Sequence, residues 1–162
     1  MRIDDELYAL AARLGELALA RSVMLAAAES CTGGLTAGAI TAVPGSSQWF
    51  ERGFVTYSNA AKVEQLGVAP ATLQRFGAVS IQTAAEMAAG ALRTSRAQWA
   101  LAVTGVAGPG GGTPEKPVGM VCFAWCGPGG VETEQALLDG DRAAIRWASV
   151  RIALAGLIGR LA

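Results

Sequence analysis

Two adjacent side chains in the segment 28–34, Ser30 and Cys31, are of types that act as nucleophiles. The segment follows residues 23–28, an apolar run with the length of a strand, and it precedes a predicted helix. Ser30 would therefore lie at the carboxyl end of a strand, where α/β sheets commonly bind ligands. The free N–H groups at the start of the helix would be suited to stabilising an oxyanion.

The same segment also has the pattern of an ordinary helix start. Thr32 is a suitable N-cap residue, and Gly33 and Gly34 allow a tight turn. Cys31 remains a rival to Ser30, although small apolar cores often bury a cysteine with no chemical role. From these residues alone, a helix cap is favoured over a nucleophile.

The sequence contains no histidine. A Ser-His-Asp or Cys-His site within one chain and a histidine-ligated metal site are therefore excluded. A general base has to be Lys, Tyr, Asp, Glu or a cysteine thiolate. The cysteines, Cys31, Cys122 and Cys126, show no zinc-ligand spacing.

Tyr57 and Lys62 are the candidate partners of Ser30. Residues 49–57 are rich in aromatic and β-branched side chains and are predicted to form a strand, and Asn59 is predicted to cap the helix that follows. Tyr57 would end the strand and Lys62 would lie in the first turns of the helix. Burial would lower the lysine pKa from about 10.4 into a useful range, and a Ser-Lys or Ser-Tyr-Lys set activates a serine without histidine. The alternative is a surface lysine and a half-buried tyrosine.

A glycine-rich loop follows the predicted strand 99–104. Five glycines in the eight residues 105–112 expose backbone N–H groups to a phosphate or carboxylate. The loop lacks the Gly-Lys-Ser/Thr of a P-loop and does not open a helix, so a flexible connection is the alternative. Arg142 and Arg146, one turn apart, would add anion contacts or form a solvated helix face.

The periodicity of the chain predicts the elements that position these residues. Helices alternate with strands early and a hairpin comes late, which indicates an α/β fold, a three-layer α/β/α sandwich with a mixed parallel and antiparallel sheet. We expect one domain over residues 1–162. The predicted helices are 4–21, 32–42, 60–66, 70–75, 81–95 and 141 to the end, and the strands are 23–28, 49–57, 99–104, 118–126 and 131–138.

Composition limits the partners and the compartment. The 13 basic residues balance 13 acidic ones, so binding to nucleic acid or to a membrane surface is not expected. No secretory start or membrane span is evident, and the odd cysteine count favours a reducing cytoplasm. Hydrophobic residues reach 52%, and this apolar surplus predicts a homodimer or a higher homo-oligomer.

The motifs taken together resemble the CinA carboxyl-terminal domain family, the nicotinamide-mononucleotide amidohydrolases. The resemblance covers essentially the whole chain in order, which makes the set much more specific than any one motif. The matching segments are residues 28–35, 44–47, 53–59 with Lys62, 66–68, 77–80, 104–111 and 116–119.

The resemblance implies hydrolysis of the carboxamide of nicotinamide mononucleotide (NMN) to nicotinate mononucleotide and ammonia, with no metal or other cofactor. It carries a catalytic set onto Ser30, Tyr57 and Lys62, and it implies a stand-alone form of the domain. We expect Ser30 to attack the amide and Lys62, helped by Tyr57, to take its proton. The alternative function is a nucleotide-binding regulatory module with little or no turnover, against which the intact catalytic set argues.

The remaining candidate residues are expected to bind the substrate. N–H groups near Cys31 to Gly34 would hold the oxyanion, and the 105–112 loop would hold the phosphate. The full set of predicted binding residues is Cys31, Thr32, Gly33, Gly34, Gly45, Ser46, Ser47, Asn59, Thr104, Gly105, Gly108, Gly110, Arg142 and Arg146.

Overall fold

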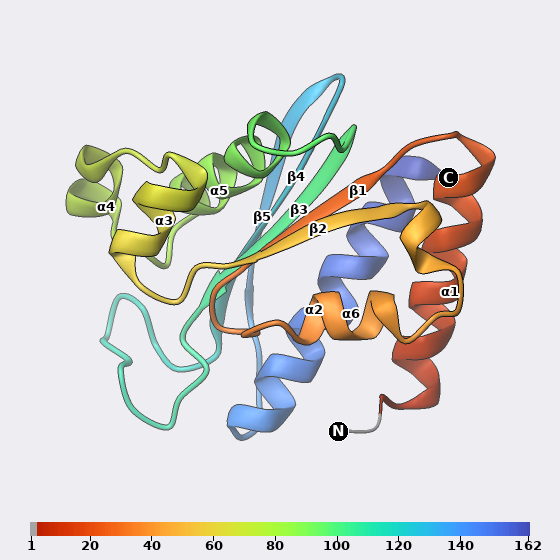
Figure 1. Cartoon of the computed structure of the whole chain (residues 1–162). Helices are drawn as coiled ribbons and strands as arrows, with labels where there is room; N and C mark the ends of the chain where they lie inside the picture. Colours follow the sequence, from red (N-terminus) through yellow and green to blue (C-terminus); the bar gives the residue numbers. More distant parts are fainter. Residues whose placement is uncertain (1–2) are drawn as a thin grey trace.

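A computed structural model describes residues 3–162 of the chain (Figure 1). Its strands are β1 (Leu25–Glu29), β2 (Phe50–Val55), β3 (Trp99–Gly105), β4 (Met120–Gly127) and β5 (Gly130–Leu137). Its α-helices are α1 (Asp5–Ala20), α2 (Leu35–Thr41), α3 (Asn59–Leu66), α4 (Pro70–Phe76), α5 (Ile81–Arg93) and α6 (Arg142–Leu161), and a short 3-10 helix, η1, spans Ser46–Gln48. The predicted elements are all present, with ends that shift by a few residues.

The strands form one mixed sheet in the order β2-β1-β3-β4-β5. β1 lies between β2 and β3 and is parallel to both, whereas β4 is antiparallel to β3 and to β5. The parallel part therefore comes from the early strands that alternate with helices, and the antiparallel part from the late hairpin. This confirms the predicted mixed sheet.

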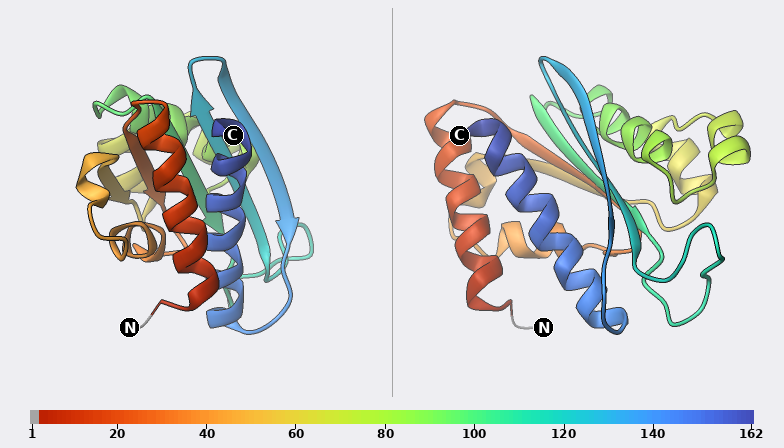
Figure 2. Two further views of the ribbon diagram at one scale, coloured as in Figure 1. Left: turned by 90° about the vertical axis from the view of Figure 1, so that its right-hand side faces the viewer. Right: turned by 180° about the vertical axis from the view of Figure 1, so that it is seen from behind.

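Helices cover both faces of the sheet, which confirms the predicted three layers. α1, α2 and α6 lie on one face, with α1 and α6 side by side, and α3, α4 and α5 lie on the other (Figures 1 and 2). The alternation along β4 divides its side chains between two cores. Phe123 and Trp125 join the core under α6, whereas Cys122 and Ala124 join the core under α5. None of the helices within residues 3–162 is long and apolar enough to cross a membrane.

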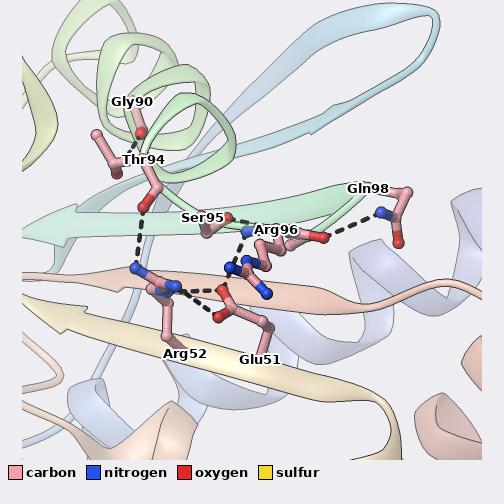
Figure 3. A network of polar contacts seen from close by, with 8 residues as sticks. Glu51, Arg52, Gly90, Thr94, Ser95, Arg96 and Gln98 are labelled. Carbon is pink, nitrogen blue, oxygen red and sulfur yellow. Dashed lines mark hydrogen bonds and ion pairs between the residues drawn. The ribbon is translucent and has the colours of Figure 1, made fainter.

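A polar network lies at the end of the sheet where the parallel strands begin (Figure 3). The guanidinium of Arg52 donates to the Glu51 carboxylate over 2.6 Å and to the carbonyl oxygen of Thr94 over 3.0 Å. The Glu51 carboxylate also accepts the backbone N–H of Arg96. These contacts join edge strand β2 to the segment between α5 and β3 at the end of the sheet far from Ser30.

The start of α3 differs from the prediction by one residue. Ser58, not Asn59, is the N-cap, and its hydroxyl accepts the N–H of Ala61 over 3.0 Å. Asn59 is the first residue of the helix and is exposed. Serine and asparagine cap helices about equally well, so residue type alone did not separate the two neighbours.

Candidate active site

Ser30 directly follows β1 at the carboxyl edge of the parallel strands. Its backbone N–H donates to the carbonyl oxygen of Val103 in β3 over 2.9 Å, which continues the strand pairing by one residue. The chain then leaves the sheet toward α2. The β1–α2 connection, the 106–119 loop and the start of α6 gather at this edge (Figure 1).

Lys62 contacts Ser30, as predicted. The Nζ atom of Lys62 lies 3.1 Å from Ser30 Oγ and 2.8 Å from the carbonyl oxygen of Thr56, and its side chain is only 1% exposed. Thr56 is in turn fixed to the end of β1, because its N–H donates to the carbonyl oxygen of Glu29 over 2.8 Å. The lysine is therefore held at two points beside the serine.

Burial changes the pKa values of two side chains beside Ser30, the amine of Lys62 and the thiol of Cys31. It lowers the pKa of Lys62, because a charged ammonium loses hydration in the interior. It raises the pKa of the Cys31 thiol to about 12, and the negative charge of Glu29 adds to this effect. Because the thiolate is the reactive form of cysteine, Cys31 is a poor nucleophile here, and Ser30 with Lys62 is the favoured pair.

Tyr57 lies at the rim of the site. Its side chain is 61% exposed, and its hydroxyl accepts a hydrogen bond from Arg142 Nη2 over 2.8 Å. Arg142 Nη1 donates to the carbonyl oxygen of Gly108 over 2.7 Å, so the guanidinium joins Tyr57 to the glycine-rich loop. Within the described chain no hydrogen bond joins Tyr57 to Ser30 or Lys62.

The turn after Ser30 is capped differently from the prediction. Thr32 does not cap α2, whose N-cap position is Gly34 at φ +98°. The N–H groups of Thr36 and Ala37 instead donate to the two carboxylate oxygens of Glu29, over 2.8 and 3.1 Å. This role of Glu29 was not predicted from the sequence, although a single carboxylate at the end of the otherwise apolar β1 was the signal.

The Glu29 cap leads to a stability prediction. Changing Glu29 to Gln should lower the free energy of unfolding by about 1–3 kcal/mol, because the amide NH2 would face one of the two N–H donors and leave it unpaired. Urea unfolding followed by circular dichroism measures this. Changing the exposed Glu64 to Gln in the same way should shift the value by less than about 0.5 kcal/mol. Equal stability of the Glu29 variant and the parent would contradict the cap.

Two backbone N–H groups beside Ser30 are left without an acceptor in another residue. Within the turn, the N–H of Gly33 donates to the carbonyl oxygen of Ser30 and that of Leu35 to the carbonyl oxygen of Thr32. Among residues 3–162 neither the N–H of Cys31 nor that of Thr32 has a hydrogen bond to another residue, and the N–H of Cys31 contacts its own thiol. Donors at the residues just after a nucleophile are suited to an oxyanion.

Arg146 binds the backbone of the turn after Ser30, and its predicted role in anion binding stays a prediction. Its Nε donates to the carbonyl oxygen of Cys31 over 3.0 Å, and its Nη2 to that of Thr32 over 3.2 Å. Gly33 lies under this guanidinium: a Cβ atom there would lie 3.3 Å from Nη2, and φ is +57°. Arg146 thus binds the turn after Ser30, whereas Arg142 lies exposed beside Tyr57.

Gly45, Ser46 and Ser47 were predicted to bind the substrate. The structure places them at the opposite end of the parallel strands from Ser30. They precede β2, whose first residue, Phe50, pairs with Leu25 at the start of β1. Because β1 and β2 are parallel, a whole strand of about 16 Å separates that end from Ser30. Binding of the substrate by these three residues stays a prediction, and within this chain they lie far from Ser30.

The residues of the glycine-rich loop are spread around the site. Thr104 is buried and its hydroxyl donates to the carbonyl oxygen of Ala78 over 2.8 Å, while Gly105 packs so closely on β4 that a Cβ atom would lie 2.8 Å from Val121. Gly108 provides the acceptor for Arg142, and Gly110 is exposed. Of the predicted loop residues, Gly108 thus has a direct contact with the rim of the site.

A cleft of about 490 Å³ lies beside Arg142. Its lining joins the glycine-rich loop to the start of α6 and consists of Ala107, Pro109, Val118, Gly140, Asp141, Arg142 and Ala143. Its lining includes Arg142, which bonds to Tyr57, but neither Ser30 nor Lys62. Within the described residues no cluster of three Cys, Asp or Glu side chains is placed to hold a metal ion.

A serine hydroxyl next to a buried lysine is the arrangement that serine–lysine hydrolases use, and here it lies at the edge of a three-layer α/β/α sandwich. The sequence matches the CinA C-terminal domain family over residues 7–161, and the chain belongs to this family.

Named relatives and a solved structure support this assignment. The chain is 51% identical over 154 residues to a nicotinamide-nucleotide amidohydrolase PncC from Pseudomonas putida, covering 95% of this chain and 96% of the relative. It is 48% identical to the Escherichia coli K12 protein of the same name, covering 93% and 92%. The crystal structure of the competence/damage inducible protein CihA from Agrobacterium tumefaciens has a TM-score of 0.94 and 50% identity, covering 98% of each chain.

Proposed function

We propose that this protein is an amidohydrolase that cleaves the carboxamide of NMN, giving nicotinate mononucleotide and ammonia in pyridine nucleotide salvage. The Ser30–Lys62 contact of 3.1 Å is the observation that carries the proposal. Relatives of about 50% identity over nearly the whole chain are named nicotinamide-nucleotide amidohydrolases, which supports the substrate.

In the proposed reaction Ser30 is the nucleophile and Lys62 is the general base. Neutral Lys62 donates one N–H to the Thr56 carbonyl oxygen, so its lone pair is free to accept the Ser30 proton. The Ser30 oxygen then bonds to the amide carbon, and the resulting oxyanion accepts hydrogen bonds from the N–H groups of Cys31 and Thr32. Lys62 returns the proton to the leaving ammonia. Lys62 then deprotonates a water molecule, which bonds to the acyl carbon as the bond from that carbon to Ser30 Oγ breaks, and Lys62 returns the proton to Ser30.

The test is incubation of the purified protein with NMN. We expect ammonia and nicotinate mononucleotide in equal amounts, measured by a coupled ammonia assay and by chromatography. Nicotinamide riboside, which lacks the phosphate, is the control for recognition of that group. Binding of NMN without release of ammonia would overturn the proposal and favour a nucleotide-binding regulatory module.

We assign the phosphate of NMN to Arg142 and the neighbouring glycine-rich loop. Arg142 is exposed, lines the 490 Å³ cleft, and has N–H groups beyond those bound to Tyr57 and Gly108. A guanidinium forms strong paired hydrogen bonds with phosphate. Arg146 also has N–H groups beyond the two that bind the turn, and it stays a second candidate.

Changing Arg142 to Ala should therefore raise the KM for NMN about 10- to 100-fold and change kcat much less, since the phosphate is remote from the reacting amide. Steady-state kinetics at several salt concentrations measures this, and the variant should show a weaker salt dependence. The same substitution should leave turnover of nicotinamide riboside unchanged. A fall in kcat alone would contradict phosphate binding by Arg142.

Tyr57 completes the proposed site as a rim residue. Its hydroxyl accepts from Arg142 and has no hydrogen bond to Lys62, so any help that it gives Lys62 with the proton requires the Tyr57 side chain to move. Asn59, exposed at the start of α3, lies two residues along the chain from Tyr57 and stays a proposed binding residue.

We also propose a single domain, a cytoplasmic location and a homodimer. The shared sheet supports the first, and three free cysteines support a reducing compartment. Val131 and Leu137, exposed on the same face of edge strand β5, support burial against a second copy. Size-exclusion chromatography with light scattering tests the dimer.

A further inference from the structure

We propose that Arg146 is a positioning residue that fixes the direction of the Thr32 N–H group and so assembles the oxyanion site. The inference rests on the proposed amide hydrolysis and assigns to Arg146 a role in it other than substrate binding. It arises from the contacts of one guanidinium with two successive carbonyl groups in the turn after Ser30.

The guanidinium of Arg146 donates two hydrogen bonds to the backbone of this turn. Its Nε and Nη2 atoms lie 3.0 and 3.2 Å from the carbonyl oxygens of Cys31 and Thr32, which are 115 and 114 residues away in sequence. None of the ion pairs within residues 3–162 includes Arg146. An arginine half-buried against neutral carbonyls, with no carboxylate partner, indicates a function that needs its fork-shaped geometry.

The direction of the Thr32 N–H group follows from these contacts. A trans peptide is planar, so its C=O and N–H bonds point in opposite directions. The carbonyl of Cys31 points at Arg146 on α6, and the N–H of Thr32, which belongs to the same peptide, therefore points away from α6. α3, which carries Lys62, lies on the other face of the sheet (Figure 1).

The neighbouring peptide is fixed by a different contact. The carbonyl of Ser30 accepts the N–H of Gly33, which closes the turn and sets the direction of the Cys31 N–H group. Gly33 and Gly34, with φ of +57° and +98°, adopt the left-handed backbone that this path requires. The Cys31 donor thus depends on the turn itself, whereas the Thr32 donor depends on Arg146.

The charge of Arg146 also strengthens the donor that it orients. A cation at the carbonyl oxygen polarises the peptide and makes the N–H at its other end a better hydrogen-bond donor. Removal of one oxyanion donor reduces kcat by about 100- to 1000-fold in a serine hydrolase. Loss of orientation leaves the N–H in place, so we expect a smaller effect, about 10- to 100-fold.

The test compares Arg146→Ala and Arg146→Lys with the parent protein, with NMN as the substrate. We expect kcat to fall about 10- to 100-fold in both variants while KM changes less than about threefold. Added guanidinium ion at millimolar concentration should restore part of kcat in Arg146→Ala, where the space is open, and not in Arg146→Lys. A general loss of stability would not respond to guanidinium in this way.

Arg151→Ala is the matched control. Arg151 is on the same helix, and its loss removes exposed ion pairs with Asp4 and Glu6, so stability changes and kcat should not. A rise in KM with unchanged kcat for Arg146→Ala, or unchanged kinetics, would overturn the inference. Thermal unfolding shows whether each variant is folded, and Arg146→Lys still decides the question if Arg146→Ala does not fold. A parent protein inactive on NMN would overturn the proposed function and the inference with it.

Discussion

Changing Ser30 to Ala should abolish ammonia release from NMN, by at least about 1000-fold in kcat, while the fold stays intact. The serine hydroxyl is the only hydroxyl that Lys62 contacts in the described chain, and without it the amide carbon has no positioned nucleophile. Ammonia assays on the purified variant measure the loss. Substrate binding should persist, because the proposed phosphate contacts lie elsewhere.

Two control variants make this result specific. Ser47→Ala, at the opposite edge of the sheet, should keep the parent kcat. Cys31→Ala should keep substantial activity, since burial raises the pKa of the Cys31 thiol to about 12 and leaves it protonated at neutral pH. Parent-level turnover by Ser30→Ala would rule out the serine mechanism and leave Cys31 or a directly activated water as the nucleophile.

Changing Lys62 to Met should reduce kcat by about 1000-fold or more. Methionine has a similar length and tolerates burial, but it cannot take the Ser30 proton or donate to the Thr56 carbonyl oxygen. In the parent protein, kcat/KM should rise with pH as Lys62 loses its proton. The rise should lie below the ordinary lysine pKa near 10.5, because burial lowers the pKa of Lys62. A pH–rate profile with no such limb would contradict Lys62 as the base.

The same pKa shift predicts how stability depends on pH. Between the lowered pKa of folded Lys62 and its ordinary value near 10.5, the unfolded chain binds more protons than the folded one, so stability rises with pH. The cost of burying a charged lysine is fully present below this window and absent above it. The free energy of unfolding of the parent, measured against that of Lys62→Met, should therefore increase as pH rises through the window.

The fold could be predicted from sequence because its signals are local. The leucines of α1 at three- and four-residue steps and the hairpin around residues 127–130 mark their elements without any distant contact. The predicted ends of elements are wrong where a side chain outside the element determines the local structure. α2 begins at Leu35 rather than at Thr32, because a side chain from the preceding strand, Glu29, satisfies its first N–H groups.

The candidate site was predictable in part. The approach of Lys62 to Ser30 follows from a strand that ends beside the next parallel strand, with a helix directly after it. The partners of Arg142 and Arg146 did not follow, because α6 reaches the site from the far end of the chain. Ser46 and Ser47 precede β2 and so lie at the amino end of that strand, whereas Ser30 follows β1 at its carboxyl end.

Lys62 approaches the turn after Ser30 from α3, and Arg146 binds the same turn from α6. These two helices belong to opposite outer layers of the sandwich, and each packs on its own hydrophobic core. The proposed reacting groups therefore keep their relative positions only while both cores are packed. Partial melting of either layer would separate the proposed base from the proposed nucleophile or release the peptide beside it. Activity of this small protein thus requires that both helical layers stay packed on the sheet. On heating, the activity should fall before the sheet itself unfolds.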